Sequence, residues 1–123
     1  GVISVGSIAS GGVITGTSVT SANMQGYRGQ TIIFFGSSDC TAVLPDIGAS
    51  STQAIGDTWE IWNAGSANFI LDRATSSQTV YILTGSAVTV ETSANPHIAP
   101  GGKAILKAAA TDTYAIHGDV VDN

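Results

Sequence analysis

The chain has 123 residues, 43% of them hydrophobic, which is enough for one compact domain with a modest core. Only 11% of the residues are charged, and four Lys and Arg against nine Asp and Glu give a net charge of -5. This sign repels phosphate backbones and anionic lipid headgroups, so we expect neither nucleic acid nor a membrane surface as a partner. The scarcity of charge, with abundant Gly, Ser, Thr and Ala, favours an all-β protein over amphipathic helices.

Cysteine content and surface charge limit the ways in which the domain can be stabilised. The single Cys40 has no second cysteine with which to form an internal disulfide or a thiolate metal site. No run approaches the roughly 18 apolar residues of a membrane span, and no basic region precedes an apolar block, so no secretory signal is expected. Because protein surfaces usually carry about 25–35% charged residues, we expect this chain to cover much of its surface with copies of itself.

The first 30 residues differ in composition from the rest. They hold no charge before Arg28, and half of them are Gly, Ser or Thr, interleaved with single Val and Ile residues. The glycines argue against a helix and weaken a long strand, while the aliphatic residues are too many for a flexible linker. We therefore predict an extended N-terminal arm, residues 1–30, that lies on a neighbouring surface and is poorly ordered over about residues 1–20 in isolation. The apolar residues expected to make its contacts are Val2, Ile3, Val5, Ile8, Val13 and Ile14. An alternative remains open, in which this segment supplies two ordinary edge strands to the main domain.

Residues 31–123 are predicted to form a β domain. Runs rich in Val, Ile, Thr and aromatics recur at short spacing with turn residues between them. The expected strands are residues 31–35, 40–44, 57–63, 69–72, 79–83, 88–91, 103–108 and 113–117. Pro45 should end the second strand, and the Ala64–Ala67 segment has the length of a hairpin turn. No helical stripe persists beyond two turns. The prediction is a small β-sandwich or β-barrel of about eight strands.

The strand at residues 57–63 carries both tryptophans of the chain. Alternation sends Trp59 and Ile61 to one face and Glu60 and Trp62 to the other. We interpret Trp59 as a core residue. Trp62 is left as either a core residue or a contact to another subunit, and a stacking platform for a sugar is the third possibility.

The motifs of nucleophilic and metal-dependent catalysis are missing from the sequence. The segment Gly36–Cys40 matches no nucleophile elbow, and the serines occur in turn-like contexts. Cys40 could pair with His97 or His117, but it occupies an apolar position of a strand and is interpreted as a small core residue. Two histidines without a third ligand at a recognisable offset make a poor metal site.

Acid–base and nucleotide chemistry are equally unsupported by motifs. Glu60, Asp72 and Glu91 are the candidates for the carboxylate pair of a glycosidase, but a chain this short has little room for the required cleft. Neither phosphate-binding glycine motif occurs. We therefore predict a protein that is not an enzyme and has no cofactor and no metal.

A histidine and a carboxylate lie close together near the end of the chain, at His117 and Asp119. Tyr114 and Ile116 should share one face of the last strand, and Ala115 and His117 the other. Gly118 should turn the chain away from the strand. His117 is therefore interpreted as a residue at a rim or at a contact between subunits.

The order of these motifs resembles a known group of proteins. The motifs on which the resemblance rests are Val43-Leu44-Pro45, Gly56–Gly65 with its IxNxG pattern, Phe69–Asp72, Ile98–Lys107 with Pro-Gly-Gly, and Tyr114–Val120. Over about residues 31–120 this layout resembles small β domains that recur in structural proteins of tailed bacteriophages. These domains include capsid decoration (cement) proteins and modules of tail fibres.

The resemblance implies a β-rich homotrimer without catalytic residues. A decoration protein binds the major capsid protein on the outside of the shell, commonly with a terminal arm, and stabilises the particle. The expected location is therefore the capsid surface of a virion, and the length of 123 residues favours this interpretation. The alternative is a receptor-binding tail module that recognises a host surface glycan, with Trp62 and Tyr81 as stacking residues.

Overall fold

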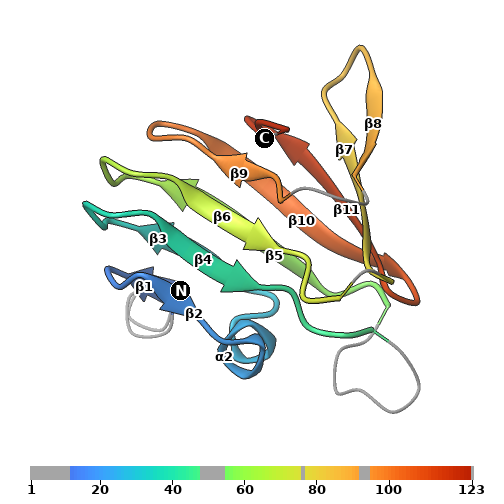
Figure 1. The fold of residues 1–123 in the computed structure, drawn as a ribbon, viewed down its shortest axis with the longest axis horizontal. Helices are drawn as coiled ribbons and strands as arrows, with labels where there is room; N and C mark the ends of the chain where they lie inside the picture. The colour runs from blue at the N-terminus through green and yellow to red at the C-terminus, as the bar shows by residue number, and fades with distance from the viewer. Residues whose placement is uncertain (1–11, 48–54, 76, 92–94, 123) are drawn as a thin grey trace, which may run out of the picture.

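The computed structural model describes residues 12–47, 55–75, 77–91 and 95–122. These residues form eleven short strands in two mixed β-sheets, one of seven strands and one of four, and one short helix (Figure 1). Alternate residues in both sheets are buried, so the sheets face each other across a shared hydrophobic core. The predicted all-β class is confirmed, and each of the eight predicted strands overlaps an observed one.

The larger sheet contains seven strands. Their order is β1 (Val13–Ile14), β3 (Thr31–Phe34), β5 (Thr58–Asn63), β10 (Lys103–Ala110), β11 (Thr113–Gly118), β7 (Thr79–Leu83) and β8 (Val88–Glu91). β1, β3 and β5 are parallel, β10 is antiparallel to both of its neighbours, and β11 is parallel to β7. The antiparallel hairpin of β7 and β8 forms one edge and projects beyond the body of the sheet (Figure 1).

The smaller sheet covers part of the larger one. Its strands lie in the order β2 (Ser18–Val19), β4 (Cys40–Val43), β6 (Phe69–Asp72) and β9 (His97–Ile98). β2, β4 and β6 are parallel, whereas β9 is antiparallel to β6.

From β1 to β6 the chain alternates between the two sheets. Each time the chain passes through both sheets, it adds one strand to each of them. Successive strands within a sheet are therefore parallel. The crossing loops stack on one another: the amide of Phe35 donates to the carbonyl of Ile14 at 2.9 Å, and that of Ala64 donates to Phe34 at 2.8 Å. The predicted hairpin at Ala64–Ala67 is therefore wrong. This loop leads from β5 in one sheet to β6 in the other, and its backbone bonds to the preceding loop.

The predicted arm is also corrected, because Val13–Ile14 and Ser18–Val19 are strands of the two sheets. β1 and β2 are edge strands, and each places one aliphatic side chain, Ile14 or Val19, in the core. Single aliphatic residues between Gly and Ser suit such two-residue strands, since only one side chain of each pair turns inward. The edge-strand alternative therefore holds for Val13–Val19. Val2, Ile3, Val5 and Ile8 lie outside the described residues.

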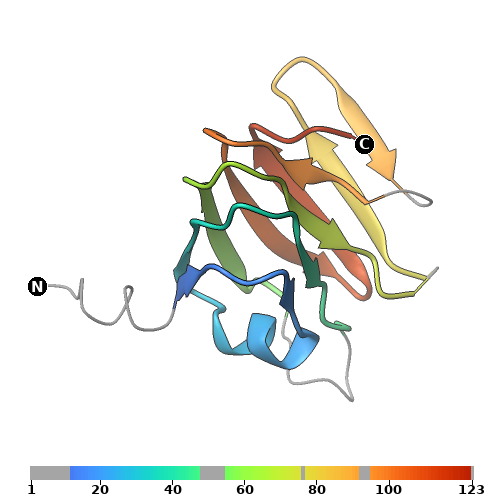
Figure 2. The same cartoon turned by 60° about the vertical axis from the view of Figure 1, so that its left-hand side comes forward.

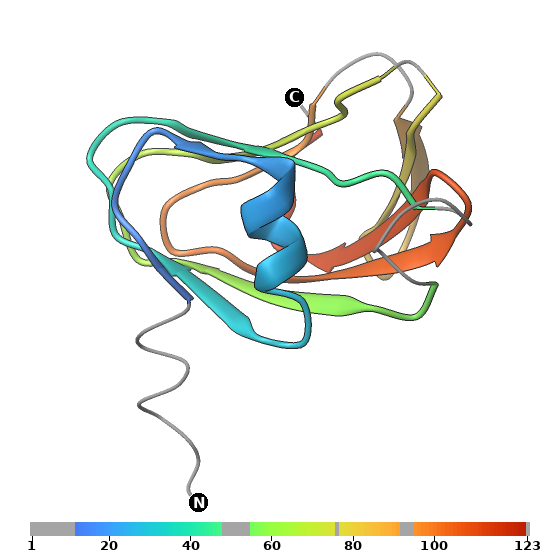
Figure 3. The same cartoon turned by 90° about the horizontal axis from the view of Figure 1, so that it is seen from below.

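Helix α2 (Ser21–Gly26) connects β2 to β3 and lies at the edge beside β1 and β2 (Figure 2). Its six residues stay within the predicted limit of two turns. Thr20 caps it, with Oγ1 accepting a hydrogen bond from the amide of Asn23 at 3.2 Å. Seen from below, the helix lies between the two layers and covers the end of the core (Figure 3). Its buried Met24 faces the core.

The core is centred on the aromatic residues of both sheets. The rings of Phe34 and Phe69 lie 5.5 Å apart, and those of Trp59 and Tyr114 lie 6.0 Å apart. Trp59 also donates from Nε1 to the carbonyl of Met24 at 2.8 Å, which ties the helix to β5. The prediction that Trp59 is a core residue is confirmed.

Candidate functional site

The residues considered for nucleophilic catalysis are kept apart. Cys40 is buried on the inner face of β4, and this burial raises the pKa of its thiol. His97 points away from the core on β9, and His117 lies on the outer face of the other sheet. Neither histidine faces Cys40, so a reactive thiolate pair does not form in this arrangement. The interpretation of Cys40 as a core residue is confirmed.

The three candidate carboxylates are also kept apart. Glu60 projects from the outer face of the larger sheet, and Asp72 from the outer face of the smaller sheet. Glu91 is buried at the end of β8. A glycosidase pair must flank one bond at a separation of several ångströms, which strands on opposite sides of the core do not provide. Over the ranges that the structure describes, no cluster of three His, Cys, Asp or Glu side chains is placed to hold a metal ion.

The outer face of the larger sheet is the broadest feature available for binding. We define the outer face as the side chains of the seven-stranded sheet that point away from the core. The register aligns Ile33, Trp62 and Lys103 across β3, β5 and β10. Such cross-strand neighbours lie about 4.5–5.5 Å apart, so they form one continuous surface.

Trp62 is held in place on this outer face. Its side chain is 41% exposed, so the open question of core or contact is decided against the core. Nε1 donates to Oε2 of Glu60 at 2.7 Å, and Nζ of Lys103 lies 5.4 Å from the ring centroid. The hydrogen bond and the cation–π contact both fix the orientation of the indole. A hollow of about 480 Å³ opens beside it, with Asn63, Gly102 and Asp119 on its other sides.

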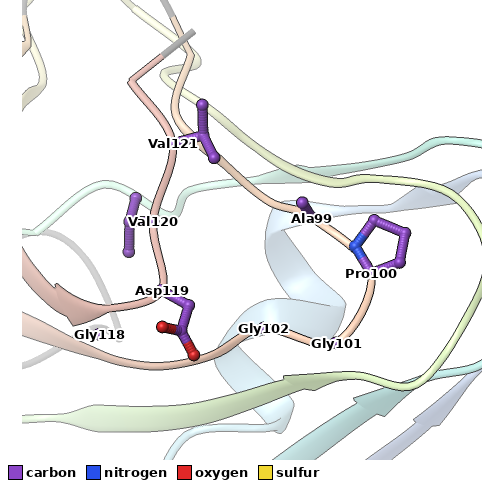
Figure 4. Close-up of a pocket in the computed structure, with 8 residues that line it drawn as sticks. All are labelled: Ala99, Pro100, Gly101, Gly102, Gly118, Asp119, Val120 and Val121. Carbon is purple, nitrogen blue, oxygen red and sulfur yellow. The ribbon is translucent and has the colours of Figure 1, made fainter.

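A second hollow (Figure 4) adjoins the first, because Gly101, Gly102 and Asp119 line both. It has a volume of about 520 Å³ and lies between the turn at Gly101 and the segment Gly118–Val121. Asp119 lines both hollows, and its Oδ2 accepts a hydrogen bond from the amide of Lys103 at 3.1 Å. Gly118 has a φ of 120°, and a Cβ there would lie 2.4 Å from the carbonyl oxygen of Lys103. The close approach of backbones thus explains this glycine.

Tyr81, the other proposed stacking residue, does not share a site with Trp62. Tyr81 is 39% exposed on β7, but β10 and β11 lie between β7 and β5 in the sheet. Three strand spacings of about 4.8 Å place the two residues about 14 Å apart across the sheet. One small sugar ring cannot stack on both.

Tyr81 belongs to an apolar surface that the sequence analysis does not predict beyond Tyr81 itself. Tyr81 aligns with Val90, and Leu83 aligns with Val88, on the outer side of the hairpin of β7 and β8. Val88 and Val90 are 62% and 50% exposed. Their alternation with Thr89 is the sequence signal that predicts a shared face, but it does not reveal which face is covered.

The outer face of the smaller sheet is polar by contrast. A basin of about 380 Å³ is lined by Asp39, Thr41, Asn68, Ile70, Asp72, Asn95 and His97. Both of its carboxylates accept hydrogen bonds from neighbouring residues. Asp39 accepts one from the amide of Asn68 at 2.9 Å. Asn95 donates to Asp72 at 3.3 Å. This surface is acidic and is organised by hydrogen bonds between its own side chains and loops.

The predicted contact residues that the structure describes divide into two kinds. Val13 is 44% exposed on the outer face of β1, whereas Ile14 is only 7% exposed. Ile14 is therefore corrected from a contact residue to a core residue, because its position in the pleat turns it inward. His117 is exposed on β11, as expected for a residue at a rim.

Comparisons of the chain with protein-family models, with curated proteins and with solved structures found no match. No helix in the part of the chain that the structure describes is both long enough and apolar enough to span a membrane.

Proposed function

We propose that this chain is a capsid decoration protein of a tailed bacteriophage. In this proposal it is a small β-sandwich that forms a homotrimer, binds the major capsid protein on the outside of the shell and stabilises the particle without catalysis. The observation that carries the proposal is the outer face, a wide and shallow surface on which exposed apolar residues lie beside few charges. Contiguous apolar surfaces of this kind are characteristic of protein–protein contacts.

The contacts assigned to this function come from both the N-terminal segment and the sheet. Val2, Ile3, Val5 and Ile8 are proposed to bind the shell or a neighbouring subunit, with Val13 and Trp62 at the same surface. Each aliphatic contact contributes roughly 1.5–3 kcal/mol when fully buried. Three linked copies raise the strength of such individually weak contacts through their effective concentration.

A co-sedimentation experiment tests the proposal. The full chain is mixed with DNA-free, expanded shells of tailed phages and centrifuged through a cushion. Saturable pelleting with one shell type, with a number of bound copies per shell divisible by three, is expected. Decorated shells should also withstand heating to a higher temperature than bare ones. Absence of binding to every shell tested would contradict decoration.

Glycan recognition is the second candidate, and the hollow beside Trp62 is the observation that favours it. The indole is exposed and fixed by Glu60, and Lys103 and Asp119 supply polar groups at the same hollow. An aromatic platform with adjacent polar groups suits a sugar ring. A glycan array with the wild-type chain and Trp62→Ala tests this function, and a tail module requires a hit that the substitution abolishes.

A further inference from the structure

The outer side of the β7–β8 hairpin carries an apolar surface of its own. We define the hairpin patch as Tyr81, Leu83, Val88 and Val90, which form two cross-strand pairs. The outer face continues across β11 and β10, where Ala115 aligns with Tyr81 and His117 with Leu83, and Ile105 aligns with His117. Ile105 is 39% exposed as well. His117 separates Leu83 from Ile105 in this row, so the apolar surface runs from β8 through β7 to Ala115, and Ile105 lies beside it.

Strand β8 is a short edge strand, and the buried Glu91 is its one inward-pointing charge. Its sequence, Val88-Thr89-Val90-Glu91, contains no Pro and no Lys, and its pairing with β7 has no bulge. Among the residues that the structure describes, β8 is the last strand of its sheet and pairs with one neighbour, β7. Such a strand, rich in β-branched residues, is suited to association with another chain.

The distribution of charge identifies the partner. All nine acidic residues lie in the described ranges, yet among the strand residues of the outer face only Glu60 is acidic. Lys103, Lys107 and His117 project from the same face. Two copies of a chain with net charge -5 repel each other, and the repulsion is least where carboxylates are scarce. Contact through the basin of the smaller sheet would instead bring Asp39 and Asp72 of both copies together.

Glu60 and Lys107 add complementarity to the same surface. They lie on adjacent strands, with Glu60 opposite Ile105 and Lys107 opposite Thr58. A second copy approaching this face can therefore place its Lys107 near Glu60 of the first while the apolar residues meet.

We propose that the hairpin patch, with Ile105 beside it, is the surface through which a second copy of this chain binds. The inference rests on the proposed function, which requires copies of the chain to associate, and it identifies the surface through which they do so. It also leaves the polar basin of the smaller sheet outside the contact between copies.

The test measures the association of the full chain by analytical ultracentrifugation from 1 to about 100 μM. The variant carries Val88→Asp and Val90→Asp. We expect the wild type to be oligomeric, and we expect the variant to associate at least about a hundredfold more weakly, because two charges must be buried. The matched control is Ile55→Asp, since Ile55 is 62% exposed, as Val88 is, but lies off the sheet. Ile55→Asp should associate like the wild type.

A second variant tests whether weaker association is caused by misfolding of the hairpin. Val88→Thr with Val90→Thr keeps the β-branched shape of both residues and should fold, as judged by circular dichroism, while weakening association about tenfold. Lys107→Glu should also weaken association, and added salt should reduce its difference from the wild type.

The outcomes separate this inference from the proposed function. An oligomer that both hairpin variants leave intact overturns the patch but not the trimer. A dimer that the variants dissociate supports the patch and contradicts the trimer. A wild-type monomer at about 100 μM overturns both the patch and the trimer, and decoration of shells is still measured independently by co-sedimentation.

Discussion

Two buried amide side chains hold loops of this protein in place. Nδ2 of Asn63 donates to the carbonyls of Ala67 at 2.8 Å and Ile98 at 2.7 Å, and its Oδ1 accepts from the amide of Gly65 at 2.9 Å. Gln78 joins β7 to the segment after β4 through a 2.9 Å bond from Nε2 to the carbonyl of Leu44. A buried amide with all of its groups paired fixes loops that have little hydrophobic contact of their own. The IxNxG pattern that carried the resemblance is thus explained here by structure.

Asn63→Ala should destabilise the fold by about 2–4 kcal/mol, because it leaves a buried carbonyl of Ile98 without its donor. Chemical denaturation monitored by tryptophan fluorescence measures the change. Ser66→Ala, in the same loop but exposed, is the control and should stay within about 0.5 kcal/mol of the wild type. Equal stabilities for both variants would show that the amide is dispensable.

The carboxyl groups of Asp122 and Glu91 interact, which predicts a dependence of stability on pH. The hydrogen bond to Glu91, with some desolvation and the charge of Glu91, raises the pKa of Asp122 above its ordinary value of 3.8. The folded state then holds a proton more tightly than the unfolded state, so this group opposes folding above its raised pKa. That penalty fades as the pH falls through the raised pKa towards 3.8.

Asp122→Asn should therefore raise stability near neutral pH and flatten the dependence of stability on pH in the acidic range. Denaturation midpoints measured from pH 7 down to about pH 3 test this. A variant whose midpoints follow the wild-type pH profile would refute the interaction.

At the scale of elements, the loops that cross between the sheets are as important as the strands. Three successive crossings stack, and their backbones bond to each other: the amide of Ser66 donates to the carbonyl of Gly36 at 3.0 Å, and that of Phe35 to Ile14. The turn at Gly101 joins the same stack by donating to the carbonyl of Asn63 at 2.8 Å. Stacking of this kind satisfies backbone groups that would otherwise be left at the ends of parallel strands.

Gly65→Ala tests the stack directly. A Cβ at Gly65 would lie 2.4 Å from the carbonyl oxygen of Gly36, so the two loops must separate. We expect a loss of about 1–3 kcal/mol in the free energy of unfolding. Gly16→Ala is the matched control, because a Cβ there has no neighbour within 4 Å. Thermal unfolding should separate the two variants, and a Gly65→Ala protein as stable as Gly16→Ala would contradict the stacking argument.

At the scale of the molecule, the protein combines two kinds of β organisation. Strands β1 to β6 alternate between the sheets and pair in parallel within each sheet, whereas β7 to β11 add a hairpin, β9 and an antiparallel pair. The two parts share one core, since Trp59 of the first part contacts Tyr114 of the second. The hairpin patch lies on the outer side of the larger sheet, which the smaller sheet does not cover, so Val88 and Val90 are exposed.

Truncation from the N-terminus should separate the contribution of strands β1 and β2 to stability from that of the segment before them. Removing residues 1–20 deletes β1 and β2 and with them the buried Ile14 and Val19. At roughly 1.5–3 kcal/mol for each buried side chain, this truncation should lose about 3–6 kcal/mol relative to a chain lacking only residues 1–11. Urea denaturation of the two truncated chains measures the difference. Equal stability would restore the prediction that all of residues 1–20 are an arm.

The sequence by itself determined the class of the fold, the positions of eight strands and the faces of individual residues. Trp59 is predicted as a core residue, and Tyr114 is predicted to share the face of Ile116 opposite to His117, because alternation along a strand depends only on the local geometry of the backbone. The choice of neighbouring strands was decided only by the tertiary structure. The loop at Ala64–Ala67 has the length of a hairpin, yet its strands join different sheets, since pairing depends on backbone groups supplied from distant parts of the chain. The same holds for the surface: alternation placed Trp62 opposite Trp59, but only the packing of the two sheets decided that one face is covered and the other is open.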